Sequence, residues 1–240
     1  MKLSNYKLII KTDRPLNTQA VSLRGFIGKR FPELSLLHNH ASDTSFIYTF
    51  PRVQYHIFNG DALIIGIEEG VDTVKYIENI LTELSLNRQI YKIVMKTGIE
   101  SENYFGILKE PLPYSFLAPW LALNEKNYEQ YQKLGTWAKK KELLESILIG
   151  NIISMSKSLG YTVPEPIKTN IGNMKEVQTK LKGTPMLGFL GTFSVNFEIP
   201  DYWGIGKSVS RGFGTIKKVG SEMWEMGSKN NEGYKTSNLK

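Results

Sequence analysis

The sequence predicts an α+β protein. Three observations in its first hundred residues support this fold class: several short segments of alternating apolar and polar residues, two segments with helical spacing of apolar residues, and an Asn59-Gly60 pair between two alternating segments. In chain order the elements are strand, helix, strand, strand, helix and strand. This is the order of a ferredoxin-like unit.

The first strand is expected over residues 2–11 and the first helix over residues 18–31. Apolar residues three or four positions apart give this helix one buried face. Pro32 ends the helix, because proline cannot continue the helical hydrogen bonding. The residues of the buried face are Ala20, Leu23, Ile27 and Phe31.

A strand interrupted by Pro51 follows, and a hairpin continues it. Its apolar residues alternate on both sides of the proline, and they are Phe46, Tyr48, Phe50, Val53, Tyr55 and Ile57. Asn59-Gly60 favours a type I′ turn, because that turn needs a positive φ at both central positions. The returning strand carries Leu63, Ile65 and Ile67.

A second helix is expected after a cap at Asp72 or Thr73. Its apolar stripe consists of Val74, Ile77, Leu81 and Leu84. Residues 90–95 read as the last strand of the unit, which completes the ferredoxin-like order.

The second half opens on a loop-rich passage with prolines at 111, 113 and 119. Helices are expected over residues 124–134 and 140–159, and Gly160 is placed to end the second of them. Strands are expected over residues 167–174, 189–199 and 215–219. We place a first domain at residues 1–100, a second at 101–222 and a flexible tail at 223–240.

The composition restricts the classes of function. The chain has 240 residues, 41% of them hydrophobic, and a net charge of +7, which favours an acidic partner such as nucleic acid. It has no cysteine, which excludes disulfides, thiolate metal sites and a cysteine nucleophile. No segment is apolar enough for a signal peptide or a membrane span, so we expect a soluble, cytoplasmic protein that does not contact a membrane.

A glycine-rich segment, residues 204–214, follows an alternating apolar stretch. Glycines allow positive φ and expose backbone N–H groups, so such a segment can hold an anion. A P-loop would place its first glycine on Asp201, and the dinucleotide fingerprint fails at Val209, so neither nucleotide motif fits. An ordinary glycine-rich connection between strands remains the alternative to a phosphate-binding loop.

Two of the three histidines, His38 and His40, lie in one short polar segment. Paired imidazoles can serve as base and acid near neutral pH. The cations Lys29 and Arg30, at the end of the preceding helix, could stabilise a phosphorane. These residues suit cleavage of RNA by its own 2′-OH, with a 2′,3′-cyclic phosphate and a 5′-OH as products and with no metal or cofactor.

Other interpretations of these side chains stay open. The histidines could be plain surface residues, or they could bind zinc with His56 as a third ligand. His56 faces opposite to Val53, Tyr55 and Ile57, which favours a solvent-facing or groove-facing position. Lys29 and Arg30 suit a helix C-terminus without any substrate, and Tyr48 could simply pack in the sheet.

Several motifs resemble the b-type branch of the Cas-six family, the CRISPR-associated repeat-cleaving endoribonucleases. In the first half they are residues 23–33, His38-Asn39-His40, residues 50–55 and residues 65–70. In the second half they are residues 118–124, 149–152, 193–202, 204–208 and 211–214. The resemblance spans nearly the whole chain, and the glycine-rich segment is the hallmark of the broader family.

The resemblance implies tandem ferredoxin-like (RRM-like) domains and metal-independent cutting of precursor CRISPR RNA within its repeats. On that basis His40, then His38, are the catalytic candidates, and Lys29, Arg30 and Tyr48 support them. A non-catalytic RNA-binding subunit of a CRISPR effector complex is the alternative function.

The resemblance also implies RNA contacts and protein partners. The candidate RNA-binding residues are Arg52, Gly204, Gly206, Lys207, Ser208, Arg211, Gly212, Phe213 and Gly214. The partners implied are the CRISPR repeat transcript, a second copy of the chain in a homodimer, and subunits of an effector complex.

Overall fold

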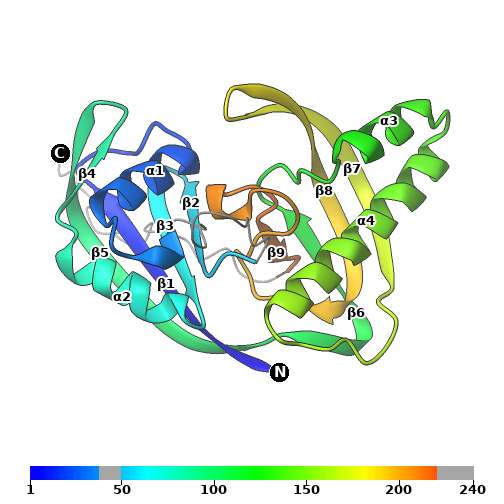
Figure 1. The fold of residues 1–240 in the computed structure, drawn as a ribbon, viewed down its shortest axis with the longest axis horizontal. Coiled ribbons are helices and arrows are strands. Elements are labelled where there is room, and N and C mark those ends of the chain that lie inside the picture. Colours follow the sequence, from blue (N-terminus) through cyan, green and yellow to red (C-terminus); the bar gives the residue numbers. More distant parts are fainter. Residues whose placement is uncertain (38–49, 221–240) are drawn as a thin grey trace, which may run out of the picture.

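The computed structural model describes residues 1–37 and 50–220, which form two antiparallel sheets side by side (Figure 1). Residues 38–49, and the tail expected at residues 223–240, lie outside the described part of the chain. Both sheets carry helices, so the predicted α+β class is confirmed. No helix of the described residues is long and apolar enough to cross a membrane.

The first sheet has the strand order of a ferredoxin-like unit with one strand added at its edge. Across the sheet the strands are β2 (Val53–Phe58), β3 (Asp61–Ile67), β1 (Lys2–Thr12), β5 (Gln89–Tyr104) and β4 (Glu83–Leu86). Helices α1 (Ala20–Arg30) and α2 (Gly70–Ile80) cover one face, and a short 3-10 helix, η1 (Ser35–Leu37), follows α1. The Asn59-Gly60 turn joins β2 to β3 as predicted, and both residues have positive φ.

The predicted second helix is too long. Helix α2 ends at Ile80, and Leu84, expected on its apolar stripe, lies instead in β4. Leu84 and Leu86 alternate into the core while Glu83 and Ser85 face outward, so the period-two pattern prevails after Leu81.

The second sheet has the same strand order as the first, without the added edge strand. Its strands are β7 (Thr169–Leu181), β8 (Thr184–Glu198), β6 (Gly106–Phe116) and β9 (Ile216–Lys218), and α3 (Glu125–Lys133) and α4 (Trp137–Ser158) follow β6. Where the first unit has α2, the second has an extended passage whose described helix is the 3-10 turn η2 (Val209–Arg211). The tandem ferredoxin-like fold is thus present with its last helix replaced.

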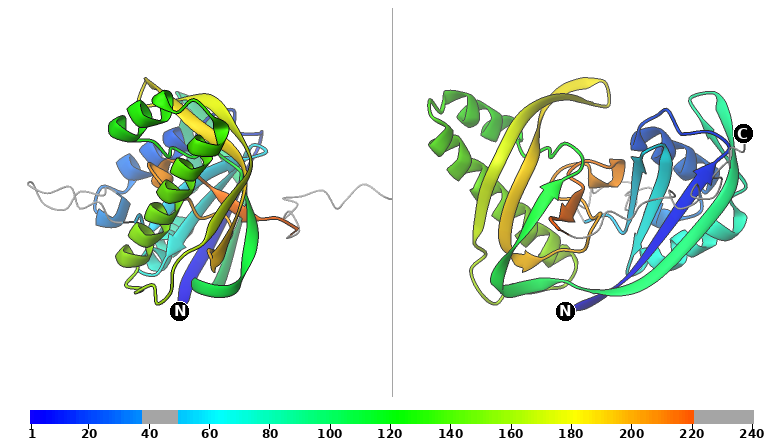
Figure 2. Two further views of the ribbon diagram at one scale, coloured as in Figure 1. Left: turned by 90° about the vertical axis from the view of Figure 1, so that its right-hand side faces the viewer. Right: turned by 180° about the vertical axis from the view of Figure 1, so that it is seen from behind.

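Strand β6 occupies the passage expected to be loop-rich, so that expectation is wrong. The register with β8 shifts between Ile107 and Leu112, and Pro111 lies within the displaced residues. A proline is tolerated there because the displaced residues make no regular ladder hydrogen bonds. Strand β5 runs past residue 100 and is followed at once by β6, as the rear view in Figure 2 shows.

The two units share an apolar core. Residues of the uncovered face of the first sheet, such as Ile9, Leu63 and Ile65, belong to one cluster with Phe105 and Trp203. A second cluster fills the space between the first sheet and its helices. Because the first core is continuous between the units, the glycine-rich segment is held in a fixed place between them.

Candidate nucleic-acid interface at the glycine-rich segment

The glycine-rich segment lies between the two units and packs against β2 and α1 (Figure 1). Gly204 donates its backbone N–H to Gln54 Oε1 of β2 at 2.9 Å, in a buried position. Just before the segment, Trp203 Nε1 donates to Asn5 Oδ1 of β1 at 3.2 Å. These bonds fix the segment to the first sheet.

Close packing explains the glycines. A Cβ at Gly212 would lie 2.9 Å from both Ala20 Cβ and the carbonyl oxygen of Tyr55, and the φ of +84° is one that side chains disfavour. At Gly206, with φ +89°, a Cβ would lie 2.7 Å from Trp120 Nε1 and 3.1 Å from Asn151 Oδ1 of α4. The segment therefore uses glycine to approach α1, β2 and α4 closely.

His56 lies beneath this segment and is fully buried, so the expected solvent-facing or groove-facing position is wrong. Its Nδ1 is 2.9 Å from Thr215 Oγ1, and Thr215 Oγ1 donates to the carbonyl of Gly212 at 2.9 Å. A hydroxyl has one proton, so His56 donates from Nδ1 and its Nε2 is unprotonated. Burial lowers the pKa of His56 to about 3, which keeps the ring neutral.

A cleft of about 1080 Å³ opens between the glycine-rich segment, α3, α4 and the β7–β8 hairpin. Of the predicted RNA-binding residues, those that line it are Gly204, Gly206, Lys207, Ser208 and Arg211. Gly212, Phe213 and Gly214 do not line the cleft, and the two glycines pack closely on other backbone atoms. Four cations from several elements line it, Arg24, Lys182, Lys207 and Arg211, against the two carboxylates Glu125 and Glu176. This excess of positive charge makes the cleft attractive to a polyanion.

Arg24 of α1 also lines the cleft, although no sequence pattern predicts a functional role for it. Its position opposite Arg211 depends on how the two units pack. Burial, and next the charge of Arg24, lower the pKa of Arg211. The two guanidinium groups therefore face the same space.

The remaining predicted residues lie in different places. Lys29 and Arg30 are exposed at the end of α1. Arg52 is mostly buried: its Nε pairs with Glu69 at 2.9 Å, and a terminal nitrogen donates to the carbonyl of Ser158 at 2.9 Å, which joins β2 to the end of α4. His38, His40 and Tyr48 lie outside the described residues.

Metal ligands do not gather in this part of the molecule. Across residues 1–37 and 50–220, no group of three or more His, Asp or Glu side chains is placed to hold a metal ion. His56, weighed as a zinc ligand, instead bonds Thr215 and stacks on Phe58, with ring centroids 5.7 Å apart.

Comparisons with known proteins agree over both units. The family models for the Cas6b N-terminal domain and the Cas6b C-terminal domain match residues 1–103 and 106–219. A crystal structure of Cas6b is 39% identical, covers 91% of this chain and 100% of that chain, and has a TM-score of 0.84. A crystal structure of the CRISPR RNA processing endoribonuclease Cas6b is 37% identical, covers 91% and 100%, and has a TM-score of 0.73.

An uncharacterized protein of Methanocaldococcus jannaschii is 45% identical over 139 residues, which are 58% of this chain and 94% of that protein. The family models span both sheets and the glycine-rich segment between them. With this coverage, the chain belongs to the Cas6b family.

Proposed function

We propose that this protein cuts precursor CRISPR RNA within its repeats, without a metal ion, and leaves a 2′,3′-cyclic phosphate and a 5′-OH. As a Cas6b protein with a solved relative that is a CRISPR RNA processing endoribonuclease, it is an endoribonuclease of that pathway. The single observation that carries the proposal is the cationic cleft beside the glycine-rich segment. A bound RNA backbone there would release counterions and gain affinity.

In the proposed reaction, His38 and His40 divide the proton transfers. One imidazole accepts the proton of a ribose 2′-OH as its oxygen attacks the adjacent phosphorus. The bond from phosphorus to the 5′ oxygen breaks, and the other imidazole protonates that oxygen. Near neutral pH, one ring can be neutral while the other is protonated, which is the state that this step requires.

Cations supply the second part of the proposed mechanism. Lys29 or Arg30 stabilises the extra negative charge on the phosphorane, and Tyr48 donates to a phosphate oxygen. Lys207 and Arg211, at the rim of the glycine-rich segment, hold the RNA backbone in register. The glycines and Arg52 contact other parts of the protein. Their proposed role is therefore indirect, because they hold the walls of the cleft in place around the RNA.

The proposal is tested by incubating repeat RNA with the protein in excess EDTA. Cleavage should persist, and His40→Ala and His38→Ala should each lower the rate by about 10² to 10⁴. The chain offers a matched control in its third histidine. His56→Asn should change the stability of the fold, but the cleavage rate, measured well below the melting temperature, should stay unchanged.

End-group analysis completes the test. A 3′-hydroxyl with a 5′-phosphate would contradict attack by the ribose, and loss of cleavage in EDTA would favour a metal-dependent nuclease. Tight binding of uncut RNA would instead favour the non-catalytic subunit of an effector complex.

The same proposal includes the protein partners and the compartment. The protein would act in the cytoplasm, as a homodimer, and would pass its product to other subunits of a CRISPR effector complex. Light scattering with and without repeat RNA measures the oligomeric state, and a monomer under both conditions would contradict the homodimer.

A further inference from the structure

We propose that Arg24 and Arg211 together hold one phosphate of the RNA, and that Tyr128, across the cleft, stacks on an adjoining unpaired base. This inference rests on the proposed function and deepens it, because it assigns a part of the substrate to each wall of the cleft. It also adds two residues, Arg24 and Tyr128, that the sequence did not single out.

The two arginines come from different units of the fold. Arg24 lies on α1 of the first unit, and Arg211 ends η2 of the second. Both line the cleft, and the described contacts include no hydrogen bond or ion pair for either guanidinium group. The glycine-rich segment packs closely on α1, where Gly212 meets Ala20, and this packing brings the two arginines to one cleft.

Two cations that line one cleft and have no ion pair among the described residues can bind an anion between them. Burial and the charge of Arg24 together lower the pKa of Arg211, so this arrangement costs free energy in the absence of a ligand. A phosphate would reverse the sign of that interaction, because guanidinium groups donate forked, charge-assisted hydrogen bonds to its oxygens. The neighbouring Lys207 is exposed and adds to the positive field.

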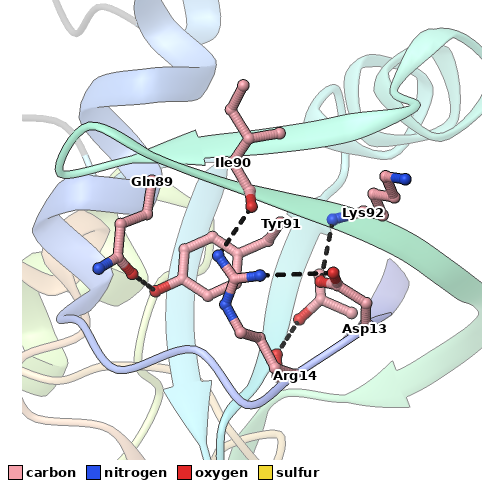
Figure 3. Close-up of polar contacts among 7 residues, drawn as sticks. Asp13, Arg14, Gln89, Ile90, Tyr91 and Lys92 are labelled. Carbon is pink, nitrogen blue, oxygen red and sulfur yellow. Dashed lines mark hydrogen bonds and ion pairs between the residues drawn. The ribbon is translucent and has the colours of Figure 1, made fainter.

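Arg14 shows how the same side chain is satisfied when it has a structural role (Figure 3). Its guanidinium group pairs with Asp13 at 3.4 Å, donates to the carbonyl of Ile90 at 3.0 Å and lies over the ring of Tyr91, 4.6 Å from the centroid. Arg14 does not line the cleft. It is therefore a matched control for substitutions of Arg24 and Arg211.

The other wall of the cleft is suited to bases. Tyr128 of α3 is 46% exposed, and the exposed residues Gln132 and Gln178 line the same cleft. An exposed aromatic ring can stack on any base, and carboxamides offer both a donor and an acceptor to base edges. Glu176, also on this wall, is already engaged by Tyr131 and Lys140.

The chemistry of this wall favours an unpaired strand. The cleft volume of about 1080 Å³ lies just above the range of about 300–1,000 Å³ for sites that enclose a drug-sized ligand, so a few nucleotides fit within it. Bases in a double helix are stacked on one another and present no free face to a tyrosine.

The test measures binding of a repeat RNA with 2′-O-methyl groups, which cannot be cut by 2′-OH attack, at several salt concentrations. Arg24→Ala and Arg211→Ala should each weaken binding at least about tenfold, the loss expected for hydrogen bonds to a charged group. The double variant should lose little more affinity than either single variant, because one arginine alone holds the phosphate poorly. For each single variant, the plot of the logarithm of the binding constant against the logarithm of the salt concentration should be less steep by about 0.7. This is the value for one phosphate of a single strand.

Further variants separate charge, stacking and folding. Arg14→Ala should bind like the wild type, and Arg24→Lys, which keeps the charge, should lose less than Arg24→Ala. Tyr128→Phe should retain affinity, whereas Tyr128→Ala should lose about 5- to 150-fold, the range measured for one stacked base. Melting temperatures of all variants identify any loss that comes from unfolding.

Failure of this inference is distinguishable from failure of the proposed function. If the wild type cuts unmodified repeat RNA but the arginine variants bind like Arg14→Ala, the phosphate site is overturned. If a fully paired repeat duplex binds equally well and loses equally with Tyr128→Ala, the assignment of unpaired bases is overturned. If the wild type does not cut, the proposed function fails, and the binding results still decide the phosphate and base sites.

Discussion

His56 is buried in full, yet within the described residues its ring makes one hydrogen bond, from Nδ1 to Thr215. The ring of Phe58 stacks on it, and no described group bonds its Nε2. A proton on Nε2 would therefore place an unsolvated charge between the two units, which explains the low pKa.

This burial predicts a dependence of stability on pH. The pKa of His56 is about 3 in the folded protein, against an ordinary value of 6.5, so between these values the unfolded chain binds a proton that the folded protein does not. The free energy of unfolding should fall as pH drops below about 6.5, by up to about 1.4 kcal/mol per pH unit from this group. His56→Asn should flatten the slope between pH 6.5 and 5 in urea titrations, and equal slopes for both proteins would contradict the prediction.

The alternation in the sequence predicted correctly that His56 faces opposite to Tyr55. It could not predict what covers that face, because Thr215 and Gly212 are far away along the chain. The same reason explains why Arg24 was missed, whereas Lys207 and Arg211 were found as local companions of glycines.

The glycine-rich segment connects β8 to β9 where the first unit has a helix. Its position depends on glycine at the points of closest approach, and Gly212 is the one that meets α1 and β2. A second glycine with the same φ of +84°, Gly183, turns the β7–β8 hairpin, where a Cβ would have no atom within 4 Å. The pair separates the cost of the backbone conformation from the cost of the contact.

Gly212→Ala and Gly183→Ala should each lower the free energy of unfolding by about 1–2 kcal/mol, because a Cβ disfavours the left-handed conformation. Gly212→Ala should lose more, since Ala20 and Tyr55 must also move. For a chain of this size each kcal/mol lowers the melting temperature by about 2–4 °C, so calorimetry can resolve the difference. Equal melting temperatures for the two variants would mean that α1 moves aside at Gly212 without a loss of stability.

Most elements were predictable because their patterns are local. The helix spacing, the Asn59-Gly60 turn and the glycine-rich segment appear in the expected order. Strand β6 was missed because its prolines normally argue against a strand, and only the register shift opposite β8 makes room for Pro111. Strand β4 was missed because Leu81 and Leu84 also fit a helical spacing.

The two units are joined by buried polar contacts as well as by the shared core. Gln54 accepts from the N–H of Gly204, and Asn5 accepts from Trp203. Arg52 adds a bond to the end of α4. A molecule held together in this way should unfold as one cooperative unit, although it contains two ferredoxin-like repeats.

Gln54→Ala tests this cohesion. The change leaves the buried N–H of Gly204 without its acceptor and should cost about 1–3 kcal/mol. The matched control is Gln89→Ala, because the exposed Gln89 accepts a similar bond from Tyr91 at 2.8 Å (Figure 3) and should cost less. Scanning calorimetry should give a single transition for the wild type, and two separate transitions would contradict the cooperative unit.

The first hundred residues carried a readable topology, whereas the second unit was recognisable mainly through family resemblance. Its replaced helix removes half of the local pattern that identifies a ferredoxin-like unit. How the units meet depends on packing between distant residues such as Ile65 and Trp203, which no local pattern encodes.

The apolar face that the first sheet turns toward its neighbour has a consequence for the history of the protein. A fragment ending near residue 105 would expose Ile9, Leu63 and Ile65 to water and would be prone to aggregate. The sequences of the two units cannot then change independently, and one unit cannot be replaced by that of another protein. A change of shape on one side of the shared core must be matched on the other side. Chimaeras assembled from distant homologues should therefore express poorly unless both surfaces are taken from the same parent.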